Sequence, residues 1–163
     1  SCMNVEDLAR VRQRVGVPIA ADESIRRAND PFRVVECEAA DLAVIKVAPL
    51  AGVRRALDLA LQLPIPVVVS SAIDTSIGLA AGVAIAAALP DLPHACGLDT
   101  QRLLVGDVAG PLISRDGQLS PSDARAVASG DLLEPELGEG ASAASLVDEW
   151  TSRAEAKLSL IPI

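Results

Sequence analysis

The chain has 163 residues, of which 50% are hydrophobic and 1% aromatic, and its 22 acidic and 14 basic residues give a formal net charge of −8. A chain this rich in apolar residues can bury enough surface to offset the entropy lost on folding, which excludes a disordered protein. The acidic charge and the scarcity of aromatic side chains argue against nucleic acid or an anionic membrane as a partner, since phosphates would be repelled and unpaired bases would find no stacking surface.

The number and spacing of the cysteines and the length of the apolar runs indicate the cellular compartment. Cys2, Cys37 and Cys96 are odd in number and widely spaced, a pattern typical of neither a disulfide framework nor a cysteine-based metal site. The longest uncharged run, Ile77–Leu89, has 13 residues, fewer than the ~20 needed to cross a bilayer, and no signal-peptide pattern opens the chain. We therefore expect a soluble, cytoplasmic protein.

Short apolar segments alternate with helical patterns along the first two thirds of the chain. The expected strands are Val17–Ala21, Leu42–Val47, Pro66–Val69 and His94–Cys96, each uniformly apolar, as strands buried on both faces are. The expected helices are Val5–Val15, Ser24–Val35, Val53–Leu63 and Thr75–Leu89. This alternation predicts an α/β fold with parallel strands and right-handed crossovers.

Four strands make half of a (β/α)8-type barrel, which usually needs ~250 residues. We expect residues 1–105 to form this partial barrel and residues 106–163 to form an irregular C-terminal tail that acts as a cap or return segment. Within that tail, Asp131–Gly140 is an acidic linker and Ala141–Lys157 has a helical pattern.

A polar or small residue lies at or near the C-terminal end of each expected strand. Asp22, Lys46, Ser70 and Gly97 follow one another at spacings of 46 − 22 = 24, 70 − 46 = 24 and 97 − 70 = 27 residues. Because active sites of β/α folds are built at this edge, these residues are candidates for one site.

Lys46 is one of two lysines in the chain and lies inside the apolar stretch LAVIKVAPL. A charged ammonium there would cost several kcal/mol without a compensating partner. Lys46 either extends its charge from a strand end into solvent or acts as a catalytic lysine, as an acid/base, an electrostatic stabiliser or a Schiff-base former. We favour the catalytic role.

The remaining candidates have ordinary structural explanations as well. Asp22 and Glu23 suit Mg²⁺, although acidic residues are also common at helix N-termini. Ser70, Ser71 and Gly97 would let an anionic ligand approach the strand ends, although such residues often end strands. Asp22 and Lys46 together could stabilise an enolate through a metal ion and an ammonium.

Four motifs resemble one family in order and spacing: PIAADES, AVIKVAPLAG, VVVSSAIDTSIGLAAG and ACGLDT. Together they are similar to the C-terminal half of the barrel in the enolase superfamily, muconate lactonizing enzyme subgroup, and within it to the o-succinylbenzoate synthase family. The resemblance covers residues 1 to about 105. It implies a magnesium-dependent dehydration of a cyclohexadiene carboxylate through an enediolate, in menaquinone biosynthesis.

The resemblance also implies roles for individual residues. Asp22 matches a metal ligand, and Lys46 matches a lysine that stabilises the enediolate across the substrate from the base. Ser70 and Gly97 match positions that contact the substrate's carboxylate or succinyl arm. Glu23 and Ser71 would support the site from behind the residues that touch the ligand.

The family's other lysines and metal ligands have no counterpart in this chain. We therefore expect a fragment, or a chain whose N-terminal half-barrel is supplied elsewhere, and we expect the isolated chain to be inactive and to self-associate or dissolve poorly. Three alternatives remain open: an N-acylamino acid racemase or another enzyme of the same subgroup, a Schiff-base aldolase that uses Lys46, and a non-catalytic half barrel.

Overall fold

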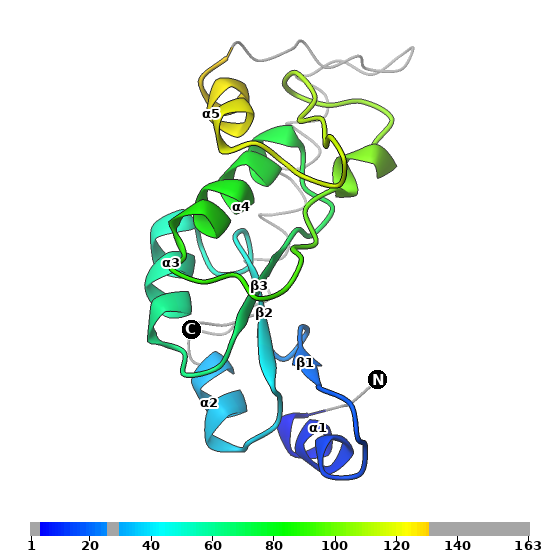
Figure 1. The fold of residues 1–163 in the computed structure, drawn as a ribbon, viewed down its shortest axis with the longest axis vertical. Coiled ribbons are helices and arrows are strands. Elements are labelled where there is room, and N and C mark those ends of the chain that lie inside the picture. Colours follow the sequence, from blue (N-terminus) through cyan, green and yellow to red (C-terminus); the bar gives the residue numbers. More distant parts are fainter. Residues whose placement is uncertain (1–3, 26–29, 131–163) are drawn as a thin grey trace, which may run out of the picture. The chain divides into compact units, whose positions relative to one another are not determined.

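The computed structural model describes residues 4–25 and 30–130 (Figure 1). Within these ranges, three strands form one parallel sheet in the order β1-β2-β3. The strands are β1 (Ala20–Ala21), β2 (Leu42–Lys46) and β3 (Val67–Ser70). The register pairs Ala21 with Ala43 and Lys46 with Ser70. The predicted α/β class with parallel strands is confirmed.

Helices precede, connect and follow the strands. They are α1 (Val5–Arg12), α2 (Asp30–Glu36), α3 (Val53–Gln62), α4 (Ser76–Ala88), the 3-10 helix η1 (Thr100–Leu103) and α5 (Pro121–Ser129). Helix α5 was not expected from the sequence; its first turn carries a proline and is capped by the Ser120 hydroxyl. Across residues 4–25 and 30–130, every helix lacks the length or the apolar character that a bilayer crossing requires.

Several predicted boundaries are wrong. Strand β1 is two residues long instead of the five of Val17–Ala21, and α1 ends at Arg12 instead of Val15. Ser24 lies in a turn outside any helix, whereas α2 begins at Asp30.

The segment His94–Cys96, which we expected to be a strand, is irregular and meets the sheet through a single bridge from Gly97 to Ser70. Pro93, directly before it, carries no N–H for a ladder hydrogen bond, and the bonding to β3 is at Gly97, whose N–H donates to the Val69 carbonyl. The predicted linker Asp131–Gly140 and helix Ala141–Lys157 lie outside the described residues.

The two faces of the sheet differ in burial. Ala43, Ile45, Val67 and Val69 point to one face and are at most 6% exposed. Helices α3 and α4 pack against β2 and β3, and Figure 1 shows both on the same side of these strands. Lys46 and Ser70 alternate with the buried residues and are half-buried, so their side chains share the opposite face.

Helix α4 contacts both α3 and α5 (Figure 1). Its sequence, SIGLAAGVAIAAA, has no charged residue, as expected of a helix that is buried on several sides. At Gly82 the helix comes so close to Leu98 that an added Cβ would lie 2.7 Å from the Leu98 Cδ2 atom. The segment after Gly97 is therefore packed tightly onto α4.

The opposite, N-terminal edge of the sheet is fixed by an ion pair between Arg12 and Asp41. Arg12 Nη2 lies 2.8 Å from Asp41 Oδ1, and Ile19 N donates to Asp41 Oδ2 at 2.7 Å. The Arg12 hydrogen bond, followed by the Ile19 N–H, lowers the pKa of the Asp41 carboxyl. These contacts tie α1 and the start of β1 to the residue that precedes β2.

Candidate active site

The structure brings the four strand-end residues to one edge of the sheet. Asp22 directly follows β1, Lys46 is the last residue of β2, and Ser70 is the last residue of β3. Gly97 pairs with Ser70 in a parallel bridge. Because all of these segments run in the same direction, their C-terminal ends meet at the same edge.

Lys46 and Asp22 form an ion pair at this edge. Lys46 Nζ lies 2.6 Å from Asp22 Oδ1, and the two side chains are 19% and 36% exposed. The carboxylate offsets the cost of holding an ammonium in a mostly buried position. Asp22 is therefore the partner that the apolar surroundings of Lys46 require.

Ser70 and Gly97 are in close contact across the bridge. Ser70 Oγ lies 3.3 Å from the Gly97 carbonyl oxygen, and Gly97 N donates to the Val69 carbonyl at 2.9 Å. A Cβ at position 97 would lie 2.8 Å from Ser70 Oγ, closer than real Cβ atoms come to a neighbour. Glycine at position 97 thus permits the approach of this segment to β3.

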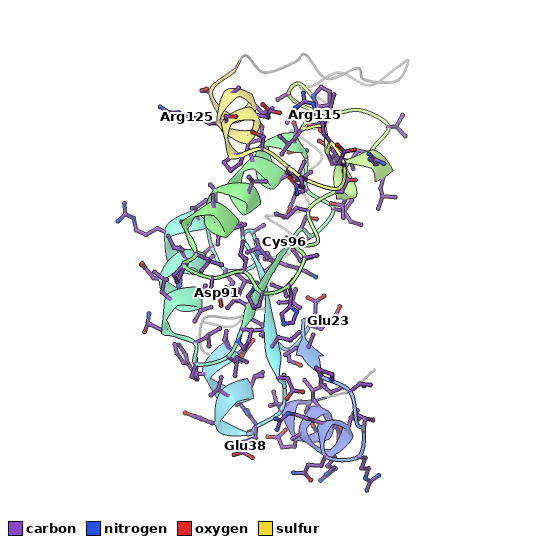
Figure 2. All side chains as sticks on the ribbon, in the orientation of Figure 1. Glu23, Glu38, Asp91, Cys96, Arg115 and Arg125 are labelled. Carbon is purple, nitrogen blue, oxygen red and sulfur yellow. The ribbon has the colours of Figure 1, made fainter. Side chains whose placement is uncertain are left out.

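The two residues expected to support the site differ in their surroundings. Ser71 is 6% exposed, and its hydroxyl donates to the Gly97 carbonyl at 3.0 Å, so its hydrogen bonds stay within the protein. Glu23 is exposed on the turn that follows β1, where Figure 2 labels it. The structure thus places the Ser71 hydroxyl in a hydrogen-bonded network behind the strand ends and Glu23 on the exposed turn after β1.

Two residues of the region behind the site were not singled out from the sequence. Thr100 Oγ1 lies 2.7 Å from Ser71 Oγ. The Asp107 carboxylate accepts from Ser76 N at 2.9 Å and from Ser76 Oγ at 3.0 Å. Thr100 lies in the motif ACGLDT, which could have pointed to it, whereas Asp107 has no comparable signal in the sequence.

Asp22 suits a hard divalent cation as one carboxylate ligand, because Mg²⁺ prefers oxygen donors. Across the described ranges, no group of three or more His, Cys, Asp and Glu side chains is arranged to hold a metal ion. Within the described ranges, the edge of the sheet thus offers the Asp22 carboxylate as a suitable oxygen donor, without a complete set of ligands beside it.

Comparison with known proteins identifies the family of this chain. The sequence profile of the family described as enolase C-terminal domain-like matches residues 1–125. The chain belongs to that family. The resemblance inferred from the four motifs is confirmed.

Two curated relatives of this enolase-family chain are named o-succinylbenzoate synthase. The one from Mycolicibacterium smegmatis is 61% identical over 119 residues, which are 73% of this chain and 37% of the relative. The one from Thermobifida fusca is 65% identical over 119 residues, which are 72% of this chain and 38% of the relative. The chain thus spans less than two fifths of the length of these relatives.

Solved structures agree with the fold. The muconate lactonizing enzyme from Pseudomonas putida is 30% identical, with a TM-score of 0.65 over 73% of this chain and 34% of that one. An N-succinyl Arg/Lys racemase from Bacillus cereus is 18% identical, with a TM-score of 0.62 over 80% of this chain and 39% of that one. At that identity, the racemase supports the fold alone.

Proposed function

We propose that this chain provides the C-terminal half of the active site of an o-succinylbenzoate synthase. The reaction would be the magnesium-dependent dehydration of a cyclohexadiene carboxylate to o-succinylbenzoate, in the cytoplasm, as a step of menaquinone biosynthesis. The observation that carries the proposal is the ion pair of Lys46 and Asp22 at the C-terminal edge of the sheet. The relatives named for this activity, at 61% and 65% identity, support the choice of substrate.

Negative charge develops on the substrate carboxylate in such a reaction. A base removes the α-proton, the electron pair of the broken C–H bond enters an enediolate, and these electrons then expel the β-hydroxyl, which leaves with a proton as water. The base would come from outside this chain. Lys46, a cation at 19% exposure, would place a positive charge beside the enediolate, where low solvent access strengthens the attraction.

Asp22 would hold Mg²⁺ together with ligands from elsewhere. When bound, the ion would supply further positive charge beside the substrate carboxylate. Ser70 and Gly97, at the ends of the next two segments along the same edge, would contact the carboxylate or the succinyl arm. Ser71 would support them from behind, and Glu23 would take part at most indirectly.

The remaining half of the barrel would be supplied by additional polypeptide, in the same chain or in another one. In the described part of the chain, the sheet face that carries Lys46 and Ser70 also carries the half-buried Val44 and Val68. A second set of strands packed on this face would bury these apolar side chains and enclose the site.

The experiment that tests this function is a dehydration assay with the N-terminal half-barrel joined to this chain. Replacing Lys46 with methionine keeps most of the side chain's length and removes its charge, and we expect kcat to fall ~10²–10³-fold, as when an electrostatic donor to a developing anion is lost. Asp22→Asn should raise the magnesium concentration needed for half-maximal activity at least tenfold. Arg54→Met, at an exposed position of α3, is the matched control and should leave kcat unchanged.

The outcomes separate this function from its alternatives. EDTA should abolish turnover and added Mg²⁺ should restore it. If Lys46→Met retains the original kcat, Lys46 does not stabilise the reaction. Trapping of substrate on Lys46 by borohydride would indicate Schiff-base chemistry instead.

A further inference from the structure

The carbonyl oxygen of Gly97 is the centre of a hydrogen-bond network behind the candidate site. It accepts from Ser71 N at 2.9 Å, from Ser71 Oγ at 3.0 Å and from Ser70 Oγ at 3.3 Å. These donors fix where Gly97 lies relative to the end of β3.

Thr100 extends this network by one hydrogen bond. Its Oγ1 lies 2.7 Å from Ser71 Oγ, a normal distance for a hydrogen bond between hydroxyl groups. Since the single hydroxyl proton of Ser71 is directed to the Gly97 carbonyl, the Thr100 hydroxyl donates to Ser71 Oγ. The relay therefore runs from Thr100 through Ser71 to Gly97, from the half-buried start of η1 to the edge of the sheet.

The position of Gly97 in turn affects Ser70. A Cβ on Gly97 would lie only 2.8 Å from Ser70 Oγ, so the two residues are closely packed against each other. Ser70 is the register partner of Lys46. A shift of Gly97 would therefore move the Ser70 hydroxyl relative to the ammonium that we assign to the substrate.

We propose that Thr100 is a positioning residue, which acts through Ser71 to fix Gly97 and Ser70 at the spacing that a carboxylate-bearing substrate requires. The proposal rests on the function proposed above, whose substrate would be bound at this edge. It assigns Thr100 no contact with the substrate.

A second attachment of the segment after Gly97 should confine the effect of losing the Thr100 hydroxyl to nearby residues. Further along the same segment, Asp107 accepts hydrogen bonds from the backbone N–H and the hydroxyl of Ser76, which is fully buried at the start of α4. Loss of the Thr100 hydroxyl would therefore loosen residues 97–100 and leave the segment attached to α4.

Thr100→Val tests the proposal, because valine has the shape of threonine without its hydroxyl. Thr100→Ser is the matched control, since it keeps the hydroxyl. In the active assembly described above, we expect Thr100→Val to raise KM for the cyclohexadiene carboxylate about tenfold, the factor that one hydrogen bond is worth, while kcat stays within about twofold. Thr100→Ser should restore KM to within about threefold of the original value.

Two further measurements support the interpretation. The first distinguishes loss of the relay from a folding failure, and the second does not depend on the proposed function. Ser71→Ala should raise KM as much as Thr100→Val, and the double variant should show no additional increase, because both changes interrupt one relay. Hydrogen exchange of the Ser71 and Gly97 amides should be faster in Thr100→Val than in Thr100→Ser.

The proposal is overturned if Thr100→Val leaves KM unchanged, or if the two single variants have additive effects. An assembly without dehydration activity would refute the proposed function. In that case the exchange rates still decide the matter: equal rates in Thr100→Val and Thr100→Ser would overturn the positioning role, and faster exchange in the valine variant would support it.

Discussion

The carboxylate of Asp107 caps helix α4 from a distant part of the sequence, and Asp107→Ala should destabilise the chain measurably. Asp107 accepts from Ser76 N at 2.9 Å and from Ser76 Oγ at 3.0 Å, and it also accepts from its neighbour Val108 N at 2.7 Å. The residue at the N-cap position, Thr75, makes no side-chain cap hydrogen bond itself. Asp107 therefore takes the place of a local cap.

The magnitude follows from the burial of Ser76, which is 0% exposed. Loss of a helix cap costs ~0.5–2 kcal/mol, and a buried donor left without a partner costs ~1–3 kcal/mol. These two energy ranges partly count the same hydrogen bonds, so they are not added, and we expect a loss of about 2 kcal/mol for Asp107→Ala. Asp107→Asn keeps an oxygen that can accept from Ser76 N, and it should lose about half as much.

The assay is urea unfolding followed by circular dichroism at matched protein concentrations. With a slope of ~2 kcal/mol per molar urea, the Asp107→Ala midpoint should fall by about 1 M. Ser76→Ala removes only the hydroxyl, and its midpoint should lie between those of Asp107→Ala and the unchanged chain. An Asp107→Ala midpoint within about 0.2 M of the unchanged chain would refute the capping role.

Two other substitutions test the ion pair of Asp41 before β2 and the packing of Gly82 in α4. Arg12 lowers the pKa of Asp41 below its ordinary value of ~3.9, so the stabilisation from this pair is complete above about pH 4 and is lost as pH falls through the lowered pKa. Asp41→Asn should therefore make the free energy of unfolding depend less on pH in this range. An equally steep loss of stability in acid for the variant and the unchanged chain would contradict this. Gly82→Ala should cost about 1 kcal/mol, because overpacking against Leu98 at 2.7 Å exceeds the gain in helix propensity. Gly110→Ala, with nothing within 4 Å of the added Cβ, is the control and should be neutral, so equal unfolding midpoints for the two variants would argue against the close contact.

Much of the fold could be predicted from the sequence because its signals are local. Apolar runs between helical patterns gave the strands β2 and β3 and the helices α3 and α4 nearly in place. The similar spacing of the strand-end residues predicted that Asp22 and Lys46 share an edge, and the 2.6 Å ion pair agrees with that placement. Parallel pairing makes this inference strong, since it fixes which ends of the strands meet.

The rest depends on contacts between residues far apart in the chain. The segment His94–Cys96 has the composition of a strand, but Pro93 before it has no N–H to donate, and the chain there reaches β3 through the bridge at Gly97. The cap of α4 comes from Asp107, 31 residues after Ser76, and no local pattern indicates it. Thr100 belongs to the motif ACGLDT, but its hydrogen bond to Ser71 depends on the fold, which brings together two hydroxyls 29 residues apart in the chain.

The most direct test of the central claim is a crystal structure of the complete assembly with Mg²⁺ and o-succinylbenzoate bound. We predict an Asp22 carboxylate oxygen ~2.0–2.1 Å from the ion, and the Lys46 ammonium within hydrogen-bond distance of the ligand's carboxylate. A ligand bound away from both side chains, or an ion coordinated without Asp22, would contradict the claim that the two residues serve one site.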